Sequence, residues 1–204
     1  MLGERFGVHR SAVQAKQIVM APFLFALAAV FLMSLGARDQ LMMARMSAQS
    51  GEAGSLLFIG IVVSAITAAV MAYGGSWMAS LLPARAQYML TAFALGAAAF
   101  ELAWRVKLKK PDEPTQSKGA FAIVLAATQM HDAARFIVFA FAAGAAAAPA
   151  AGLGGALGGA AALYLGWTLG GELEKWPLKP IRWVLAALAL AAGIYMALLA
   201  RGWV

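Results

Sequence analysis

Long apolar stretches separated by short polar turns make up most of the 204-residue chain. The apolar segments cover about residues 18–48, 55–82, 86–104, 119–148, 153–170 and 182–200. A helix of about 20 apolar residues crosses the roughly 30 Å hydrocarbon core of a bilayer. The pattern therefore predicts an all-α integral membrane protein with six transmembrane helices.

The first and fourth apolar segments each contain a polar interruption near the middle. The interruptions are residues 34–40, with the sequence SLGARDQ, and residues 128–135, with the sequence TQMHDAAR. Each segment has about 30 residues and would form ~45 Å of continuous helix, which exceeds the bilayer core. We therefore expect each segment to be tilted, to protrude from the membrane or to be broken at its polar motif.

The composition agrees with a membrane protein, since 63% of the residues are hydrophobic and only 12% are charged. The chain has no cysteine, which excludes disulfides and cysteine metal sites. We assign the net charge of +7 to membrane topology, because no basic run is interleaved with aromatic residues as in a nucleic-acid-binding surface. No nucleophile and base pair, P-loop or dinucleotide motif is present, so we predict that the protein is not an enzyme and has no nucleic-acid partner.

The order of the segments divides the chain into two halves. We expect an N-terminal interfacial segment (1–17), a first three-helix repeat (18–105), a linker (106–118) and a second three-helix repeat (119–201). An offset of 97 residues relates Arg38 to Arg135, Pro83 to Pro180, Arg85 to Arg182, and Gly96 to Gly193. Because three crossings is an odd number, duplicated halves would enter the membrane from opposite sides, as inverted repeats.

Basic residues predict the orientation, because cytoplasmic loops carry an excess of Lys and Arg. The linker and the loop at 172–182 would lie on one side of the membrane with Lys107, Lys109, Lys110, Lys118, Lys175, Lys179 and Arg182. The opposite side would hold Arg5, Arg10, Lys16, Arg85 and Arg201. We predict a multi-pass protein of the bacterial inner membrane with the linker in the cytoplasm and both termini outside.

The two polar motifs form the candidate transport site, because ionisable side chains within a membrane are costly and often functional. In transporters with inverted repeats, the substrate site lies near the bilayer midplane at interrupted helices. The candidate ligand-binding residues are Ser34, Arg38, Asp39, Thr128, Gln129, His131, Asp132 and Arg135. On a continuous helix, Thr128, Asp132 and Arg135 would share one face.

Three smaller patterns predict packing or surface contacts. Overlapping GxxxG spacings at residues 154–159 would let a neighbouring helix approach closely. Glu101 and Arg105 have the i,i+4 spacing of a salt bridge on one helix face. We interpret a stripe of methionines as packing rather than as a soft-metal site. The stripe consists of Met33, Met42, Met43 and Met46.

The chain resembles the six-span manganese or calcium cation/proton exchangers of bacteria, chloroplasts and Golgi, within the lysine exporter superfamily. That family has in each half a motif of Glu, an apolar residue, Gly, Asp, a basic residue and Thr or Ser, usually followed by Gln. The residues that fit this motif are Leu35, Gly36, Arg38, Gln40 and Asp132. The residues that depart from it are Ser34, Ala37, Asp39, Gln129, His131 and Ala133.

The resemblance implies a cation site at the two motifs, although at least three of the four family carboxylates are absent. The metal ligands would be Asp132, Asp39 and Gln129. Mn²⁺ and Ca²⁺ are hard cations that bind oxygen atoms, and each would be transported cargo rather than a resident cofactor. The arginines of the motifs would oppose a dication unless they point elsewhere.

Three functions remain open. The first is secondary transport of Mn²⁺ or Ca²⁺ in exchange for protons, in which His131 could carry protons because imidazole titrates near neutral pH. The second is a transport-inactive membrane scaffold or partner subunit, with Asp132 and Asp39 neutralised by salt bridges to Arg38, Arg45 or Arg135. The third is transport of an anionic or amphoteric solute bound by the arginines. The expected partners are the lipid bilayer and further membrane subunits or copies of the same chain.

Overall fold

The computed structural model describes residues 20–50, 54–104, 117–145 and 147–203. Most of these residues are helical and none of them lies in a strand, which confirms the predicted all-α class. The elements are a helix at Met20–Met33, α2 (Arg38–Ser50), α3 (Gly54–Ser80), α4 (Ala84–Ala103), α5 (Lys118–Met130), α6 (Ala133–Ala145), α7 (Ala148–Leu169), the 3₁₀ helix η1 (Gly170–Lys175) and α8 (Leu178–Arg201). The expected interfacial segment 1–17, the partner Arg105 and most of the linker 106–118 lie outside the described residues.

Four of the described helices are long and apolar enough to cross a membrane, namely α3, α4, α7 with its continuation to Leu173, and α8. Two bent helix pairs bring the number to six if each pair is one span. Large apolar and aromatic side chains are exposed on the outside of the bundle, among them Phe58, Tyr73, Phe93 and Trp183. Exposure of these side chains to water would cost free energy, whereas their exposure to lipid does not. The helices thus indicate a multi-pass membrane protein.

Both long segments are broken at their polar motifs, which is one of the three expected outcomes. Met20–Met33 is bent by 63° against the helix that begins at Arg38, and α5 is bent by 57° against α6. The first break depends on Gly36, whose φ of 70° lies in the left-handed region that favours glycine. The second break is shorter and contains only His131 and Asp132 between the two helices.

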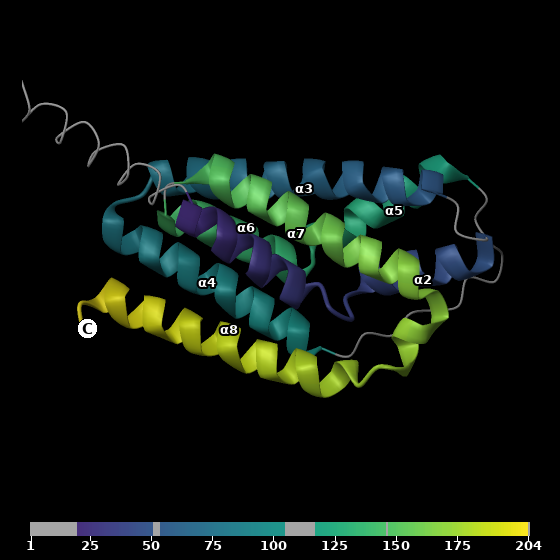
Figure 1. The fold of residues 1–204 in the computed structure, drawn as a ribbon. Helices are drawn as coiled ribbons and strands as arrows, with labels where there is room; N and C mark the ends of the chain where they lie inside the picture. Colours follow the sequence, from purple (N-terminus) through teal and green to yellow (C-terminus); the bar gives the residue numbers. More distant parts are fainter. Residues whose placement is uncertain (1–19, 51–53, 105–116, 146, 204) are drawn as a thin grey trace, which may run out of the picture.

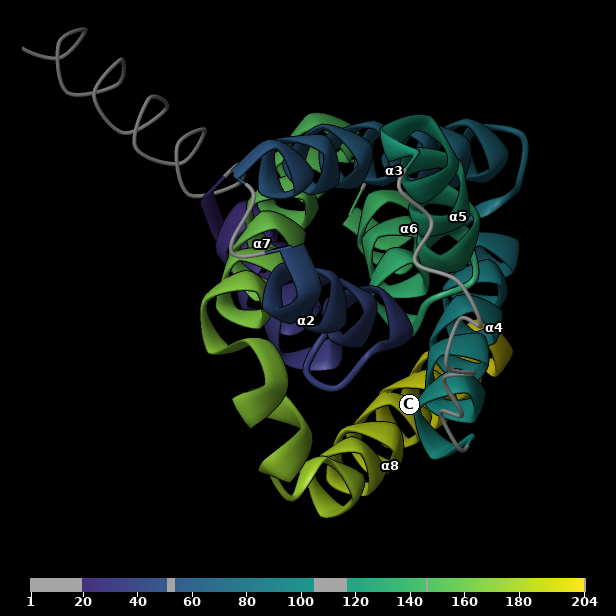
Figure 2. The same ribbon diagram turned by 90° about the vertical axis from the view of Figure 1, so that its right-hand side faces the viewer.

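The helices form an elongated bundle in which both breaks lie midway along its length (Figure 1). Two pairs of helices lie side by side and run in opposite directions, α3 with α7 and α4 with α8. Seen along the bundle, α2 packs near α7 while α4 and α8 form a separate side (Figure 2). The first core cluster joins the helix Met20–Met33 to α4, α6 and α8, and the second joins α2, α3, α5 and α7.

The element bounds follow the 97-residue offset. Adding 97 to Met20–Met33 gives 117–130, and α5 covers Lys118–Met130. The same addition to α4 gives 181–200, which lies within α8 at Leu178–Arg201. The equivalent glycines also meet, since a Cβ atom at Gly193 would lie 3.5 Å from the backbone nitrogen of Gly96.

The glycine pattern of α7 packs as predicted. A Cβ atom at Gly158 would lie 2.5 Å from the carbonyl oxygen of Leu27, and one at Gly154 would meet the carbonyl oxygen of Phe23. The backbone of α7 therefore lies directly against the helix Met20–Met33, which any larger side chain would push away. The methionine stripe also packs, with Met33 in the first core cluster and the other three in or against the second.

Adjacent glycines on α3 give a matched test of the helix packing. A Cβ atom at Gly75 would lie 2.5 Å from the carbonyl oxygen of Phe139 on α6, whereas one at Gly74 meets no atom within 4 Å. Gly75→Ala is expected to lower the unfolding temperature in detergent by about 3–8 °C, because overpacking costs about 1–3 kcal/mol. Gly74→Ala should leave it unchanged or slightly higher. Tryptophan fluorescence during heating measures both, and equal shifts for the two variants would contradict this packing.

Candidate functional site

The two breaks meet in a buried network of polar side chains. Gln129 at the end of α5 donates its side-chain N–H to Asp39 Oδ2 at the start of α2, at 3.0 Å. Its carbonyl oxygen accepts a hydrogen bond from Arg135 Nη2 at 3.1 Å. The amide of Gln129 thus connects a carboxylate from the first motif with a guanidinium from the second. The network joins the two motifs through an amide rather than through a direct salt bridge.

Arg135 is 1% exposed and lies against polar atoms of α3. Its Nε donates to Thr67 Oγ1 at 2.9 Å, and its Nη2 donates to Ser64 Oγ at 2.9 Å. Thr67 Oγ1 also donates to the side-chain oxygen of Gln129, Oε1, at 2.8 Å. A buried guanidinium is stable only where its N–H groups have acceptors, and α3 supplies them. Ser64 and Thr67 are polar residues within an apolar span, and this sequence feature could have identified them as partners of a buried charge.

The first break is fixed by Gln40. Its side-chain oxygen accepts from the backbone N–H of Gly36 at 2.8 Å, and its side-chain nitrogen donates to the carbonyl oxygen of Ala162 on α7 at 3.0 Å. The backbone N–H of Gln40 donates to Asp39 Oδ1 at 2.8 Å. Both oxygens of the Asp39 carboxylate therefore accept hydrogen bonds, and the side chain is only 4% exposed. Asp39 is therefore a fully hydrogen-bonded member of the buried network. We call this network, formed by Asp39, Gln129, Arg135, Ser64 and Thr67, the closed network.

A pocket of about 710 Å³ opens beside this network, between α4 and α5. Its walls are mostly apolar side chains of these two helices. Four of the predicted site residues line it, namely Arg38, Thr128, His131 and Asp132. Thr128 Oγ1 donates to the carbonyl oxygen of Val124 at 2.7 Å, which leaves the lone pairs of its hydroxyl oxygen available. His131 is exposed, and its Nδ1 lies 3.1 Å from the carbonyl oxygen of Ala127.

Asp132 differs from the other buried polar residues of the site. It is 5% exposed and lines the pocket, yet its carboxylate makes no hydrogen bond or ion pair with the residues that the structure describes. Two carboxylates, Asp39 and Glu101, and two guanidinium groups, Arg135 and Arg182, act on it electrostatically across space. A buried carboxylate without a bonding partner is unfavourable, so its place in a pocket points to an exchangeable partner.

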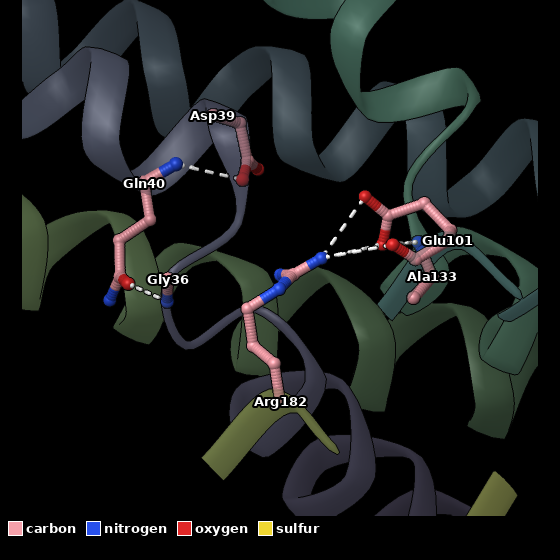
Figure 3. A network of polar contacts seen from close by, with 6 residues as sticks. All are labelled: Gly36, Asp39, Gln40, Glu101, Ala133 and Arg182. Atoms are coloured by element: carbon pink, nitrogen blue, oxygen red, sulfur yellow. Dashed lines mark hydrogen bonds and ion pairs between the residues drawn. The ribbon is translucent and has the colours of Figure 1, made fainter. Parts of the chain in front are cut away.

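An ion pair that the sequence does not predict lies at the edge of the pocket. Arg182 on α8 binds Glu101 on α4, with Nη2 at 3.2 Å from Oε2 (Figure 3). Glu101 Oε2 also accepts from the backbone N–H of Ala133, the first residue of α6, at 3.4 Å. Glu101 therefore connects α4, α8 and the second break. Glu101 can be noticed in the sequence as an acidic residue within an apolar span. Its i,i+4 spacing, however, suggests Arg105 as the partner rather than Arg182.

The structure separates the predicted site residues into two groups. Asp39, Gln129 and Arg135 belong to the closed network, whereas the residues that line the pocket are Arg38, Thr128, His131 and Asp132. Ser34 is buried in the first break. The expected common face of Thr128, Asp132 and Arg135 is wrong, because the helix is broken between Met130 and Ala133 and Arg135 lies in the closed network, while Thr128 and Asp132 line the pocket. No group of three or more His, Asp or Glu side chains within the described ranges could hold a metal ion.

The chain matches no protein-family model, no curated protein and no solved structure. The exchanger family named from the motifs therefore stays a prediction, and the functional proposal below depends on the geometry of the pocket and the network.

Proposed function

We propose that the chain is a secondary membrane transporter that exchanges a cation, first of all Mn²⁺ or Ca²⁺, for protons. The observation that carries the proposal is the Asp132 carboxylate, which is buried, faces a pocket and lacks a bonding partner among the described residues. One carboxylate cannot hold a proton and coordinate a cation at the same time, so competition between them at Asp132 produces exchange. Thr128 adds a hydroxyl oxygen to the same pocket.

The arrangement of the helices supports alternating access. Six spans in two inverted repeats are consistent with the matching element bounds and with the antiparallel pairs α3 with α7 and α4 with α8. Both breaks lie midway along the bundle, where transporters of this type bind their substrates. We retain the predicted orientation, with the linker in the cytoplasm of a bacterial cell.

The alternative of a transport-inactive scaffold requires the charges of the site to neutralise one another. In that case Asp132 would pair with Arg38 or Arg135. Arg135 is instead bound by Ser64, Thr67 and Gln129. Arg38 lines the same pocket, but within the described residues it makes no ion pair with Asp132. Among the residues that the structure describes, the Asp132 carboxylate at the wall of the pocket has no bonding partner, which favours transport over the scaffold.

Flux through proteoliposomes tests the proposal. Vesicles that contain the purified chain and an acidic interior should accumulate Mn²⁺ or Ca²⁺ from an alkaline medium and lose protons in parallel. A fluorescent cation indicator and a pH dye trapped in the same vesicles record the two movements. Protein-free vesicles control for leakage, and labelled lysine tests the amphoteric solute. Absence of Mn²⁺ and Ca²⁺ flux under every pH gradient would refute the proposal, and lysine uptake alone would replace it with the third function.

A further inference from the structure

The ion pair of Glu101 and Arg182 lies next to Asp132. Glu101 lines the same pocket as Asp132, and its carboxylate reaches the backbone N–H of Ala133, the next residue in the chain. Arg182 is 5% exposed and approaches Glu101 from α8 (Figure 3). Two carboxylates thus lie at one pocket. Asp132 has no bonding partner in the described part of the chain, whereas Glu101 is held by Arg182.

Arg182 is only partly satisfied by this contact. Its Nη2 donates to the carboxylate and to the main-chain oxygen of Glu101, each at 3.2 Å. Its Nη1 is buried and makes no hydrogen bond within the described residues. Arginine and carboxylate groups commonly pair through two nitrogens, and an unpaired buried N–H group is costly. The arginine is therefore held less firmly than the buried Arg135 in the network.

The pair joins the two halves of the chain at one end of the contact between α4 and α8. The 97-residue offset relates Arg182 to Arg85, which is exposed, and Glu101 to Leu198, which has no charge. At its other end, where these equivalent residues lie, the contact between α4 and α8 therefore forms without such a pair. The packing of these two helices thus does not require the pair, which favours a role in the pocket.

We propose that Glu101 is a second carboxylate of the cation site and that Arg182 is a tethered counter-ion, which occupies Glu101 while the site is empty and is displaced when a divalent cation binds between Asp132 and Glu101. Two carboxylates balance the charge of such a cation, and oxygen atoms are its preferred ligands. The bond from Arg182 to the main-chain oxygen of Glu101 can persist when the carboxylate turns toward the cation. This inference rests on the proposed cation transport.

Opposite changes in affinity distinguish this role from a structural salt bridge. Glu101→Gln removes a ligand and should weaken Mn²⁺ binding about tenfold, whereas Arg182→Gln removes the internal competitor and should tighten it about tenfold. Arg182→Lys, which keeps the charge but loses the planar guanidinium, should tighten binding by about threefold. Electron paramagnetic resonance of free Mn²⁺, titrated with the purified full-length chain in detergent, measures the affinity of each variant.

Each result of this experiment supports or refutes the inference. A merely structural pair would make Glu101→Gln and both Arg182 variants bind Mn²⁺ more weakly, or leave them unchanged. That result, with a wild-type chain that transports cations, would refute the inference and leave the proposed function intact. If only the Arg182 variants bind Mn²⁺, the displacement is supported and transport by the wild-type chain is refuted. If neither the wild-type chain nor any variant binds Mn²⁺, the inference is refuted, and the proposed function then stands or falls with the Ca²⁺ flux. If Arg182→Gln fails to fold, Arg182→Lys still shows whether loss of the guanidinium raises or lowers the affinity for Mn²⁺.

Discussion

Asp132→Asn is expected to abolish cation flux and at the same time to raise the unfolding temperature. Asparagine cannot exchange a proton or supply negative charge, so flux should fall by at least about a hundredfold. The stability should increase because a buried carboxylate without a bonding partner is replaced by a neutral group of the same shape. Proteoliposome flux measures the first effect, and heating in detergent with tryptophan fluorescence measures the second.

Asp39 provides the matched control for this prediction. It is as buried as Asp132, but both oxygens of its carboxylate accept hydrogen bonds, from Gln129 and from the backbone of Gln40. Asp39→Asn replaces one acceptor oxygen by an N–H donor and should lower the unfolding temperature. If Asp132→Asn destabilises the protein as much as Asp39→Asn does, the carboxylate of Asp132 has a structural partner and is not the exchange site.

Arg135→Met is expected to destabilise the protein by about 3–5 kcal/mol, because breaking a buried charged network leaves its remaining members unpaired. Ser64, Thr67 and Gln129 would lose the guanidinium that joins them, and the link from Gln129 to Asp39 would lose its orientation. We expect a low yield of folded protein and an unfolding temperature that is lower by more than in any other single variant proposed above. Size-exclusion chromatography and heating in detergent measure the two quantities.

Arg38→Met is the control for Arg135, because the 97-residue offset makes the two arginines equivalent while their surroundings differ. Arg38 is exposed at the pocket, so its replacement should change the unfolding temperature little. Arg135→Lys should be almost as damaging as Arg135→Met, since one ammonium group cannot reach the several acceptors that the guanidinium fork binds. Equal stability of the Arg38 and Arg135 variants would contradict the network.

Local sequence patterns predict the helices well, because hydropathy depends only on neighbouring residues. The third predicted span, 86–104, corresponds to α4 at Ala84–Ala103, and the second, 55–82, to α3 at Gly54–Ser80. The fifth and sixth helices begin earlier than predicted, because Pro149 and Pro180 lie in the first helical turn rather than in the preceding loop. Proline is tolerated there, since the N–H groups of the first turn have no partner within the helix.

The sequence also locates the polar motifs at the helix breaks but assigns their side chains incompletely. Helical spacing places Thr128, Asp132 and Arg135 on one face, whereas the turn at His131 and Asp132 directs Arg135 into the closed network. The likeness of the two motifs does not reveal that one carboxylate, Asp39, is fully bonded and that the other, Asp132, is not. Hydrogen bonds to α3 and to the backbone at the first break make that difference.

The sequence by itself determines an apolar all-helical chain with two interrupted helices and a 97-residue offset between its halves, because these properties depend on composition and order. Tertiary structure alone decides which charges meet. Glu101 binds Arg182, 81 residues away, because α4 and α8 lie side by side, and Gln129 binds Asp39, 90 residues away, because the two breaks face each other. Partners at such separations follow from helix packing, which local patterns do not specify. That packing leaves Asp132 facing the pocket without a partner among the described residues.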